Sequence, residues 1–253
     1  MCIKEILKKR QLAVGTMLCE FYSPNAPAVF KESGFDFFII DCEHGCYDFT
    51  AVSAMIAAAR NCGVDPVVRI PQIDKASILR YLEMGAKGLL VPMVSTAEQA
   101  REVVEYSRYA PLGARGISTR RAHNDFNSRN LTEYMMKSNH EITLMLQIET
   151  KEALANLESI AAVEGIDALM IGPTDLSSAL GDLNNFTTEK FRQAVDNVIA
   201  TAKNHGLHSG MITSDIQYLL ECRKKGMDII SWNSEIGMII SKSTEALTLL
   251  KKS

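Results

Sequence analysis

Short apolar runs alternate with amphipathic segments along most of the chain. Eight runs are almost continuously apolar, which is typical of parallel strands covered on both faces. They are "AVGTML" (13–18), "FDFFIID" (35–41), "DPVVRI" (65–70), "GLLVPM" (88–93), "ITLMLQIE" (142–149), "ALMIGP" (168–173), "LHSGMIT" (207–213) and "MDIISWN" (227–233). Segments with helical periodicity lie between them, for example 96–107, 150–163 and 188–206. The pattern therefore predicts repeated strand–helix units.

Glycines separate most helical segments from the strand that follows, where a left-handed residue can end a helix. They are Gly34, Gly63, Gly85, Gly165, Gly206 and Gly226. Eight strand–helix alternations in 253 residues indicate a (β/α)8 TIM barrel of the α/β class. A doubly wound open sheet is the alternative, but no GxGxxG motif follows the first strand. Because no linker or further repeat divides the chain, we expect residues 1–253 to form a single domain.

A long polar segment, residues 110–141, interrupts this rhythm before the fifth strand. It is rich in cationic side chains, namely Arg115, Arg120, Arg121, His123 and Arg129. Such a segment is either a solvated loop or a functional one, since long ordered loops in compact domains tend to have a function. The sequence leaves both interpretations open.

Composition narrows the class of protein. Hydrophobic residues make up 47% of the chain, charged residues 23%, and the net charge is −3, so neither nucleic acid nor an anionic membrane is an expected partner. No apolar run reaches the length of a membrane span, and the start reads as an amphipathic helix. Six scattered cysteines favour reduced thiols in a cytoplasmic protein. The alternation of Cys42, His44 and Cys46 lacks the spacing of a zinc site.

Polar residues end several of the predicted strands, and in a (β/α)8 barrel all strands end at the catalytic mouth. They are Asp41, Glu43 and His44 (second strand), Arg69 (third), Gln147 and Glu149 (fifth), Gly172, Thr174 and Asp175 (sixth), and Trp232 and Asn233 (eighth). Individually each has an ordinary explanation: Arg69 could pair with an acid, and Asp175 could cap a helix beginning at Leu176. Together they form a concentration of charge that is costly to bury without a cation or an anionic ligand.

The residue types also predict a chemistry. Glu149 and Asp175 offer the oxygen ligands that Mg²⁺ or Mn²⁺ prefers, in an incomplete shell that leaves room for substrate. A cation bound there can chelate a 2-oxo acid and stabilise its enolate. Arg69 would add positive charge at the enolate oxygen. His44 is the natural proton carrier because histidine is the side-chain type that exchanges a proton near working pH.

Six motifs resemble a known family: "DCEHG", "VVRIP", "YLEMGAKGLLVPMVSTAEQA", "YAPLGARG", "LQIET" and "EGIDALMIGPTDLSSALG". They are similar, in order and spacing, to the metal-dependent pyruvate aldolases of the HpcH/HpaI type. This family includes 4-hydroxy-2-oxoheptanedioate, 2-keto-3-deoxyrhamnonate and 2-dehydro-3-deoxyglucarate aldolases. The resemblance implies a barrel, commonly a homohexamer with its last helix exchanged between subunits. It also implies a divalent cation (Mg²⁺, Mn²⁺ or Co²⁺) and reversible cleavage of a 4-hydroxy-2-oxo acid to pyruvate and an aldehyde.

Carried over position by position, the resemblance implies a role for each site residue. Glu149 and Asp175 would bind the metal, His44 would be the base, and Arg69 would stabilise the enolate. Glu83 corresponds to the family's aspartate that raises the basicity of the active-site histidine. The implied substrate contacts are Gln147, Gly172, Pro173, Thr174 and Asp175.

The chain departs from the family pattern at several positions. Met17 or its neighbours stand where the family often has Trp, Glu83 is one methylene longer than the usual aspartate, and the eighth strand ends in "SWNSE". These changes leave the aldehyde partner open. A Schiff-base aldolase is a rival, although neither Lys87 nor Lys151 is well placed. Three more functions compete with aldol cleavage: oxaloacetate decarboxylation, addition of the enolate to another electrophile, and non-catalytic binding of metal and a 2-oxo acid.

Overall fold

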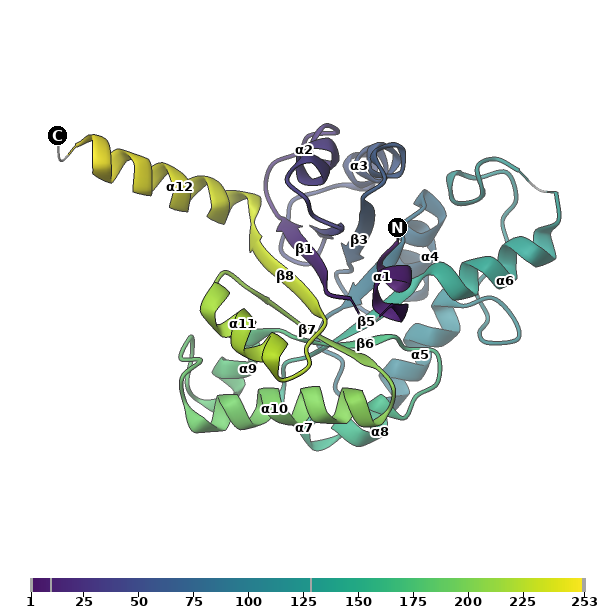
Figure 1. Ribbon diagram of the computed structural model, residues 1–253. Helices are drawn as coiled ribbons and strands as arrows, with labels where there is room; N and C mark the ends of the chain where they lie inside the picture. The colour runs from purple at the N-terminus through teal and green to yellow at the C-terminus, as the bar shows by residue number, and fades with distance from the viewer. Residues whose placement is uncertain (1, 10, 128, 252–253) are drawn as a thin grey trace.

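Eight parallel strands close into a barrel in which each strand pairs with the next along the chain and β8 returns to β1 (Figure 1). The structure, a computed structural model, describes residues 2–9, 11–127 and 129–251. The strands are β1 (Ala13–Leu18), β2 (Phe37–Asp41), β3 (Asp65–Arg69), β4 (Gly88–Val91), β5 (Thr143–Ile148), β6 (Ala168–Ile171), β7 (His208–Thr213) and β8 (Ile229–Ser234). The predicted (β/α)8 architecture is confirmed, with every strand within one of the predicted runs or a residue beyond it.

Most helices follow a strand and cover the outside of the barrel, whereas α1 precedes β1 and α12 projects from it. They are α1 (Ile3–Lys8), α2 (Ala26–Glu32), α3 (Phe49–Cys62), α4 (Lys75–Met84), α5 (Ala97–Ser107), the 3₁₀ helix η1 (Ala122–Asn124), α6 (Leu131–Glu141), α7 (Lys151–Ala155), α8 (Leu157–Ala161), α9 (Pro173–Leu180), α10 (Glu189–Asn204), α11 (Ile216–Lys224) and α12 (Glu235–Leu250). The predicted helix over 150–163 is two short helices. They part at Asn156, whose side-chain amide donates a hydrogen bond to the Ser95 carbonyl oxygen at 2.8 Å.

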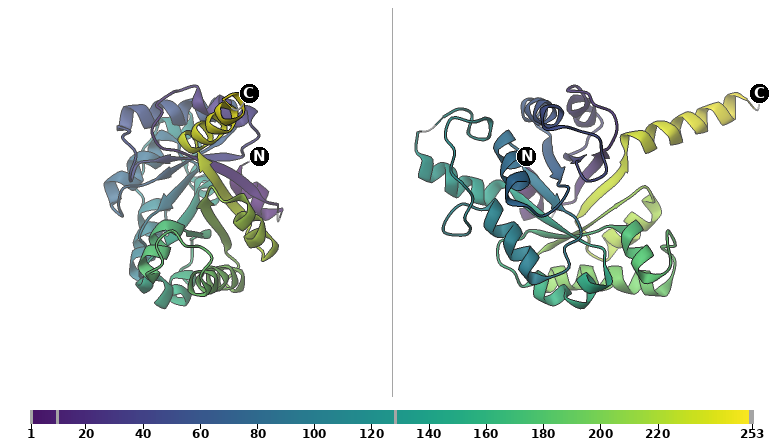
Figure 2. Two further views of the ribbon diagram at one scale, coloured as in Figure 1. Left: turned by 90° about the vertical axis from the view of Figure 1, so that its left-hand side faces the viewer. Right: turned by 180° about the vertical axis from the view of Figure 1, so that it is seen from behind.

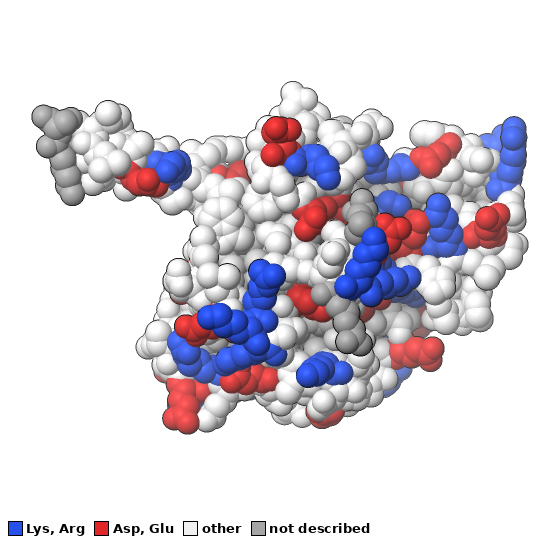
Figure 3. Space-filling view, viewed as in Figure 1, with Lys and Arg blue, Asp and Glu red and all other residues white. Residues whose placement is uncertain are grey.

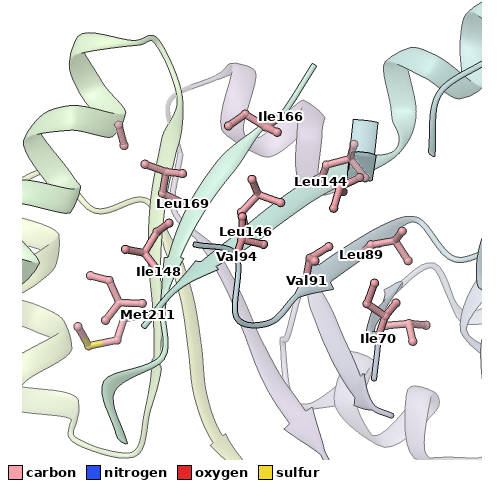
Figure 4. Packing of buried hydrophobic residues seen from close by; sticks show 14 of the residues in the cluster. Ile70, Leu89, Val91, Val94, Leu144, Leu146, Ile148, Ile166, Leu169 and Met211 are labelled. Carbon is pink, nitrogen blue, oxygen red and sulfur yellow. The ribbon is translucent and has the colours of Figure 1, made fainter. Parts of the chain in front are cut away.

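Apolar side chains fill the space on both sides of the barrel wall. The outer layer packs between strands and helices, and Figure 4 shows part of it, including Leu89, Leu146 and Leu169. A smaller inner cluster fills the barrel itself, and Ile3, Ile6 and Leu7 of α1 belong to it. Because α1 precedes β1, it closes the amino end of the barrel and leaves the carboxyl end as the open mouth.

The polar segment 110–141 contains η1 and α6 and lies beside α4 and α5, to the side of the barrel (Figure 1). Arg115 is 4% exposed and stacks its guanidinium over the Tyr109 ring at 4.6 Å. His123 contacts Tyr134 through Nδ1 at 2.6 Å, and burial with nearby Arg115 lowers the pKa of His123 to about 4. None of the described residues of this segment lines the cavity at the barrel mouth described below. The packing supports a structural role for its buried residues.

The last helix, α12, projects away from the barrel (Figures 1 and 2). Of its residues only Glu235, at its first position, is buried. Five large apolar side chains elsewhere on the helix have exposed fractions between 49% and 71%, namely Ile239, Ile240, Leu247, Leu249 and Leu250. In Figure 3 this arm carries few charged side chains, whereas positive and negative residues are interspersed over the barrel on the face shown. No described helix has both the length and the apolar character needed to cross a membrane.

Candidate active site

A cavity of about 290 Å³ opens at the carboxyl ends of the strands. Six residues predicted from the sequence line it, namely Arg69, Gln147, Gly172, Pro173, Thr174 and Asp175. Sequence reasoning missed most of the opposite wall, which comprises Cys19, Ile212, Thr213, Ser214 and Ser234 beside Met17 and Asn233. The strand ends converge because parallel strands in a closed barrel all finish at one rim.

Arg69 is held by two acids. Its Nε and Nη2 donate to Asp41 Oδ1 and Oδ2 at 2.9 and 2.6 Å, and its Nη1 lies 3.2 Å from Glu43 Oε2. Strands β2 and β3 place Asp41 directly beside Arg69 in register. Burial alone would raise the pKa of Asp41, but the hydrogen bonds and positive charge of Arg69 hold it below its usual value. This bidentate pair fixes the orientation of the guanidinium.

His44 lies at the rim of the mouth rather than on the cavity wall. Its side chain is 68% exposed, and its Nε2 lies 3.8 Å from Glu43 Oε2. The backbone N–H groups of Glu43 and His44 both donate to Asp41 Oδ1, at 3.1 and 3.2 Å. Asp41 therefore holds two groups in place, the turn that bears His44 and the guanidinium of Arg69. The sequence did not reveal this role.

Glu149 is buried directly behind the cavity wall. It is 3% exposed, and its Oε1 accepts the backbone N–H of Met93 at 2.7 Å. Gln147 Nε2 donates to Oε2 at 2.7 Å, so the two side chains face the same way, as predicted from their spacing. Burial, with the nearby charges of Asp175 and Glu43, raises the pKa of Glu149 to about 7. A carboxylate in this position needs a compensating positive charge.

Gly172 is required where β6 turns into α9. A Cβ added there would lie 1.9 Å from Glu149 Oε2, so only glycine lets the backbone approach this carboxylate. Pro173 then starts α9, which explains why the predicted strand 168–173 ends at Ile171. Asp175 lies in the first turn of α9 and is not the cap of a helix beginning at Leu176, because the helix begins at Pro173.

Comparison with known proteins identifies the family of this chain. The family model described as HpcH/HpaI aldolase/citrate lyase matches residues 21–241. The chain belongs to this family. It is 33% identical over 252 residues to a 5-keto-4-deoxy-D-glucarate aldolase of Klebsiella pneumoniae, covering 98% of this chain and 96% of that protein. A 5-keto-4-deoxy-D-glucarate aldolase of Escherichia coli O139:H28 is 31% identical, again covering 98% of this chain and 96% of that protein. The family predicted from the motifs is confirmed, and with it a lyase of the aldolase type.

Solved structures of similar proteins agree with the fold along the whole chain. The HpcH/HpaI aldolase of Desulfitobacterium hafniense DCB-2 has a TM-score of 0.96 and 33% identity, covering 100% of this chain and 98% of the other. The citrate synthase SbnG has a TM-score of 0.90 and 25% identity, covering 99% and 98%. Both correspond to this chain over nearly its full length.

The HpcH/HpaI family depends on a divalent metal, and the residues present fit one. Glu149 is a buried carboxylate with an elevated pKa, and Asp175 is close enough to contribute to that elevation. Gln147 Oε1 is a buried acceptor without a hydrogen-bond partner among the described residues. The same part of the chain contains no cluster of three or more His, Cys, Asp or Glu side chains suited to an ion. The site therefore suits a cation that prefers oxygen ligands and that completes its coordination shell with water and substrate.

Glu83 does not line the cavity, and the role that the family resemblance implied for it stays a prediction. It lies near the end of α4, which runs from the mouth back toward the start of β4, and it lines a shallow hollow with Phe49, Arg80 and Arg121. Described contacts include no hydrogen bond or ion pair between Glu83 and His44.

Glu235 is a site-supporting residue that sequence reasoning missed. Its carboxylate is 6% exposed and accepts backbone N–H groups from Cys19 (2.9 and 3.0 Å), Glu20 (2.6 Å) and Phe21 (3.1 Å). It thereby ties the loop after β1, including the cavity residue Cys19, to the start of α12. The only feature of the sequence that could have indicated this role is the position of Glu235 directly after the last strand.

Replacing Glu235 with Ala is expected to lower the free energy of unfolding by roughly 1–3 kcal/mol, because three partly buried N–H groups lose a charged acceptor. Hydrogen exchange should accelerate at residues 19–21. Chemical denaturation and exchange measured by mass spectrometry check both effects. Glu20→Ala, which removes an exposed carboxylate of the same loop, should change stability by less than about 0.5 kcal/mol. Unchanged exchange at 19–21 in the Glu235 variant would contradict the anchoring role.

Proposed function

We propose that this protein is a divalent-metal-dependent class II aldolase that reversibly cleaves a 4-hydroxy-2-oxo acid to pyruvate and an aldehyde. The observation that carries the proposal is the cavity that joins Arg69, Gln147 and Asp175, with the buried carboxylate of Glu149 behind it. Its volume is close to the lower end of the range for small-molecule sites. The names of the curated relatives make 5-keto-4-deoxy-D-glucarate the first substrate to test.

Substrate binding follows from the groups that face the cavity. The carboxylate of a 2-oxo acid suits the N-terminus of α9, where the N–H groups of Thr174 and Asp175 have no carbonyl partner within the helix. Arg69, oriented by Asp41, offers its remaining N–H groups to the oxygen of the 2-oxo group. Gln147 adds an amide beside the same carboxyl end. These contacts fix the pyruvate half of the substrate.

Cleavage requires one proton transfer at each end of the broken bond. A base removes the proton of the 4-hydroxyl group, the C3–C4 bond breaks, and the electron pair passes to the pyruvate enolate, whose C3 is then protonated. We assign the proton carrier to His44, which stands at the mouth beside Glu43. Arg69 stabilises the negative charge that develops on the enolate oxygen. Glu149 and Asp175 would hold Mg²⁺, Mn²⁺ or Co²⁺, and the cation would supply Lewis-acid stabilisation of that same charge.

A turnover assay tests the function. Purified protein supplied with Mg²⁺ or Mn²⁺ is expected to release pyruvate from 5-keto-4-deoxy-D-glucarate or a related 4-hydroxy-2-oxo acid, detected by a coupled lactate dehydrogenase assay. Exhaustive chelation should abolish release, and returning the metal should restore it. Release that persists after chelation would contradict the metal-dependent mechanism.

Rival functions give different results in the same experiments. A Schiff-base aldolase would trap pyruvate with borohydride, but no described cavity residue is a lysine and Lys87 pairs with Glu141 at 3.2 Å. The similarity to the citrate synthase SbnG favours, as second candidate, addition of the enolate to another 2-oxo acid. Product analysis with oxaloacetate separates that reaction and simple decarboxylation from aldol cleavage. A non-catalytic binding barrel would not exchange the methyl protons of pyruvate in deuterated water.

We further propose that the chain acts as one barrel domain in a cytoplasmic homo-oligomer, such as a hexamer, in which α12 packs on another copy. The support is the exposure of Ile239, Ile240, Leu247 and Leu249 on a helix that leaves its own barrel. An arm of this kind is stable when a second surface covers its apolar side chains. Analytical ultracentrifugation of the full chain measures the assembly.

A further inference from the structure

Strand β8 contains an irregularity where it passes the cavity. Its pairing with β1 runs from Ala13 opposite Ile229 to Gly15 opposite Ser231, and then shifts so that Met17 lies opposite Ser234. Two residues of β8, Trp232 and Asn233, therefore oppose the single residue between Gly15 and Met17. Such a bulge redirects side chains, and bulges are common beside active sites.

The two residues of the bulge lie on opposite sides of the barrel wall, which continues the alternation of Ile229 in the inner cluster and Ile230 in the outer one. Trp232 faces the outer layer, where its indole N–H donates to the Ser214 carbonyl oxygen at 3.3 Å, so it is a packing residue. Asn233 faces the cavity and has a φ of +59°, a left-handed conformation that asparagine tolerates better than most residues. The structure therefore brings an amide into the cavity in place of a large aromatic ring.

Contacts on three sides hold Asn233 in this position. Its Oδ1 accepts the N–H of Ser234 at 2.9 Å, and its backbone oxygen accepts the Thr16 hydroxyl at 3.2 Å. At Gly237 an added Cβ would lie 1.9 Å from Asn233 Oδ1, so glycine in α12 makes room for the amide. Oδ1 can only accept, and no described contact engages Nδ2, so Nδ2 is the amide group that can donate a hydrogen bond to a ligand in the cavity.

Asn233 stands across the cavity from the groups assigned to pyruvate. Those groups come from β3, β5 and β6, whereas Asn233 comes from β8, which lies between β7 and β1. Its neighbours on this wall are neutral and mostly polar, namely Cys19, Thr213, Ser214 and Ser234. Arg69 is the single Lys or Arg among the described cavity residues. This wall is therefore suited to the aldehyde half of the substrate.

We propose that Asn233 is a specificity-determining residue, whose Nδ2 donates a hydrogen bond to an oxygen substituent of the aldehyde. This inference rests on the proposed aldolase function. It predicts selection for hydroxylated or carboxylated aldehydes, because an alkyl aldehyde would leave the amide N–H without an acceptor when it displaces water.

The test uses two nearly isosteric aldehydes in the direction of synthesis, with pyruvate and Mn²⁺. The unmodified protein is expected to prefer glycolaldehyde to propanal in kcat/KM by roughly tenfold to a hundredfold, the effect of one unpaired buried donor. Asn233→Gly, which suits the left-handed backbone, should reduce this ratio to near one, mainly through the KM for glycolaldehyde. Trp232→Phe, on the outward side of the same bulge, should leave the ratio unchanged.

A second variant separates hydrogen bonding from mere packing. Asn233→Asp keeps the shape and the bond from Ser234 but replaces the donor with a charged acceptor. It should retain use of glycolaldehyde, whose hydroxyl can donate, and lose at least about tenfold in kcat/KM for glyoxylate through like-charge repulsion. Equal changes for the two aldehydes would overturn the proposal.

Exchange of pyruvate methyl protons in deuterated water distinguishes the two levels of failure, since it requires enolate formation but no aldehyde. Exchange in the unmodified protein, together with an unchanged glycolaldehyde-to-propanal ratio in Asn233→Gly, overturns the role of Asn233 and leaves the proposed function standing. No exchange and no cleavage in the unmodified protein overturns both.

Discussion

Replacing Arg69 with Ala is expected to reduce kcat for cleavage of a 4-hydroxy-2-oxo acid by about 10²–10³-fold. This is the typical effect of removing one oriented electrostatic group from the charge that develops in a transition state. Two observations support a large effect: Arg69 lines the cavity, and Asp41 fixes its guanidinium by two hydrogen bonds. Steady-state kinetics with saturating Mn²⁺ measures the loss.

Stability complicates this variant, because Asp41 is 2% exposed and Arg69 is its main partner. Leaving a buried charge unpaired costs roughly 3–5 kcal/mol. The matched control is the double variant Arg69→Ala with Asp41→Asn, in which the neutral amide no longer needs a cation. We expect the double variant to recover part of the stability and none of the turnover. Recovery of turnover together with stability would mean that Arg69 acts only by holding the fold.

Glu149→Gln is the second large effect, and we expect it to weaken binding of Mn²⁺ by more than about a hundredfold. Loss of a residue that merely supports a metal ligand costs 10–100-fold, so loss of a ligand itself should cost more. Titration calorimetry or the electron paramagnetic resonance of Mn²⁺ measures binding directly, without reliance on turnover. Turnover should fall with metal occupancy.

The same variant should not unfold the protein. The new amide is close in shape to the carboxylate, its oxygen can still accept the Met93 N–H, and Gln147 can rotate to present its unpaired Oε1. Burial raises the pKa of Glu149 to about 7, so above that pH the folded metal-free protein bears the cost of a buried charge that a neutral amide avoids. We therefore expect the metal-free variant to be at least as stable as the metal-free parent at pH 8.

A matched variant and thermal unfolding control for effects other than loss of the metal ligand. Glu152→Gln changes an exposed carboxylate on α7 and should alter neither Mn²⁺ affinity nor stability. In thermal unfolding, Mn²⁺ should raise the Tm of the parent and of the Glu152 variant but not that of the Glu149 variant. Tight Mn²⁺ binding by the Glu149 variant would exclude this carboxylate as a ligand.

The strand–helix pattern was predictable from the sequence because it depends on local properties. Continuous apolar runs such as Phe37–Ile40 can be buried only between two layers, and glycines such as Gly63 and Gly85 supply the positive φ that ends a helix. Errors occurred where a local feature competed with the pattern. Pro173 converted the end of a predicted strand into a helix start, and Asn156 divided a predicted helix.

Candidate site residues followed from the barrel topology and the family motifs, since every strand end reaches one rim. The contacts among them did not follow. Asp41 was not predicted to organise the turn bearing His44, and Glu235 was recognised only through the backbone groups that it binds. Both depend on the directions of helices and loops, which a sequence pattern does not contain.

By itself, the amino-acid sequence determined the barrel, its open catalytic end and the family of this protein. Those properties result from residue order and hydrophobic period, which act along the chain. Only the tertiary structure decided that Glu149 lies behind Gln147, that Trp232 faces outward and that Asn233 enters the cavity. The reason is physical: which face of a strand points into the barrel, and where an extra residue is accommodated at its end, depend on pairing with a distant strand, here of β8 with β1.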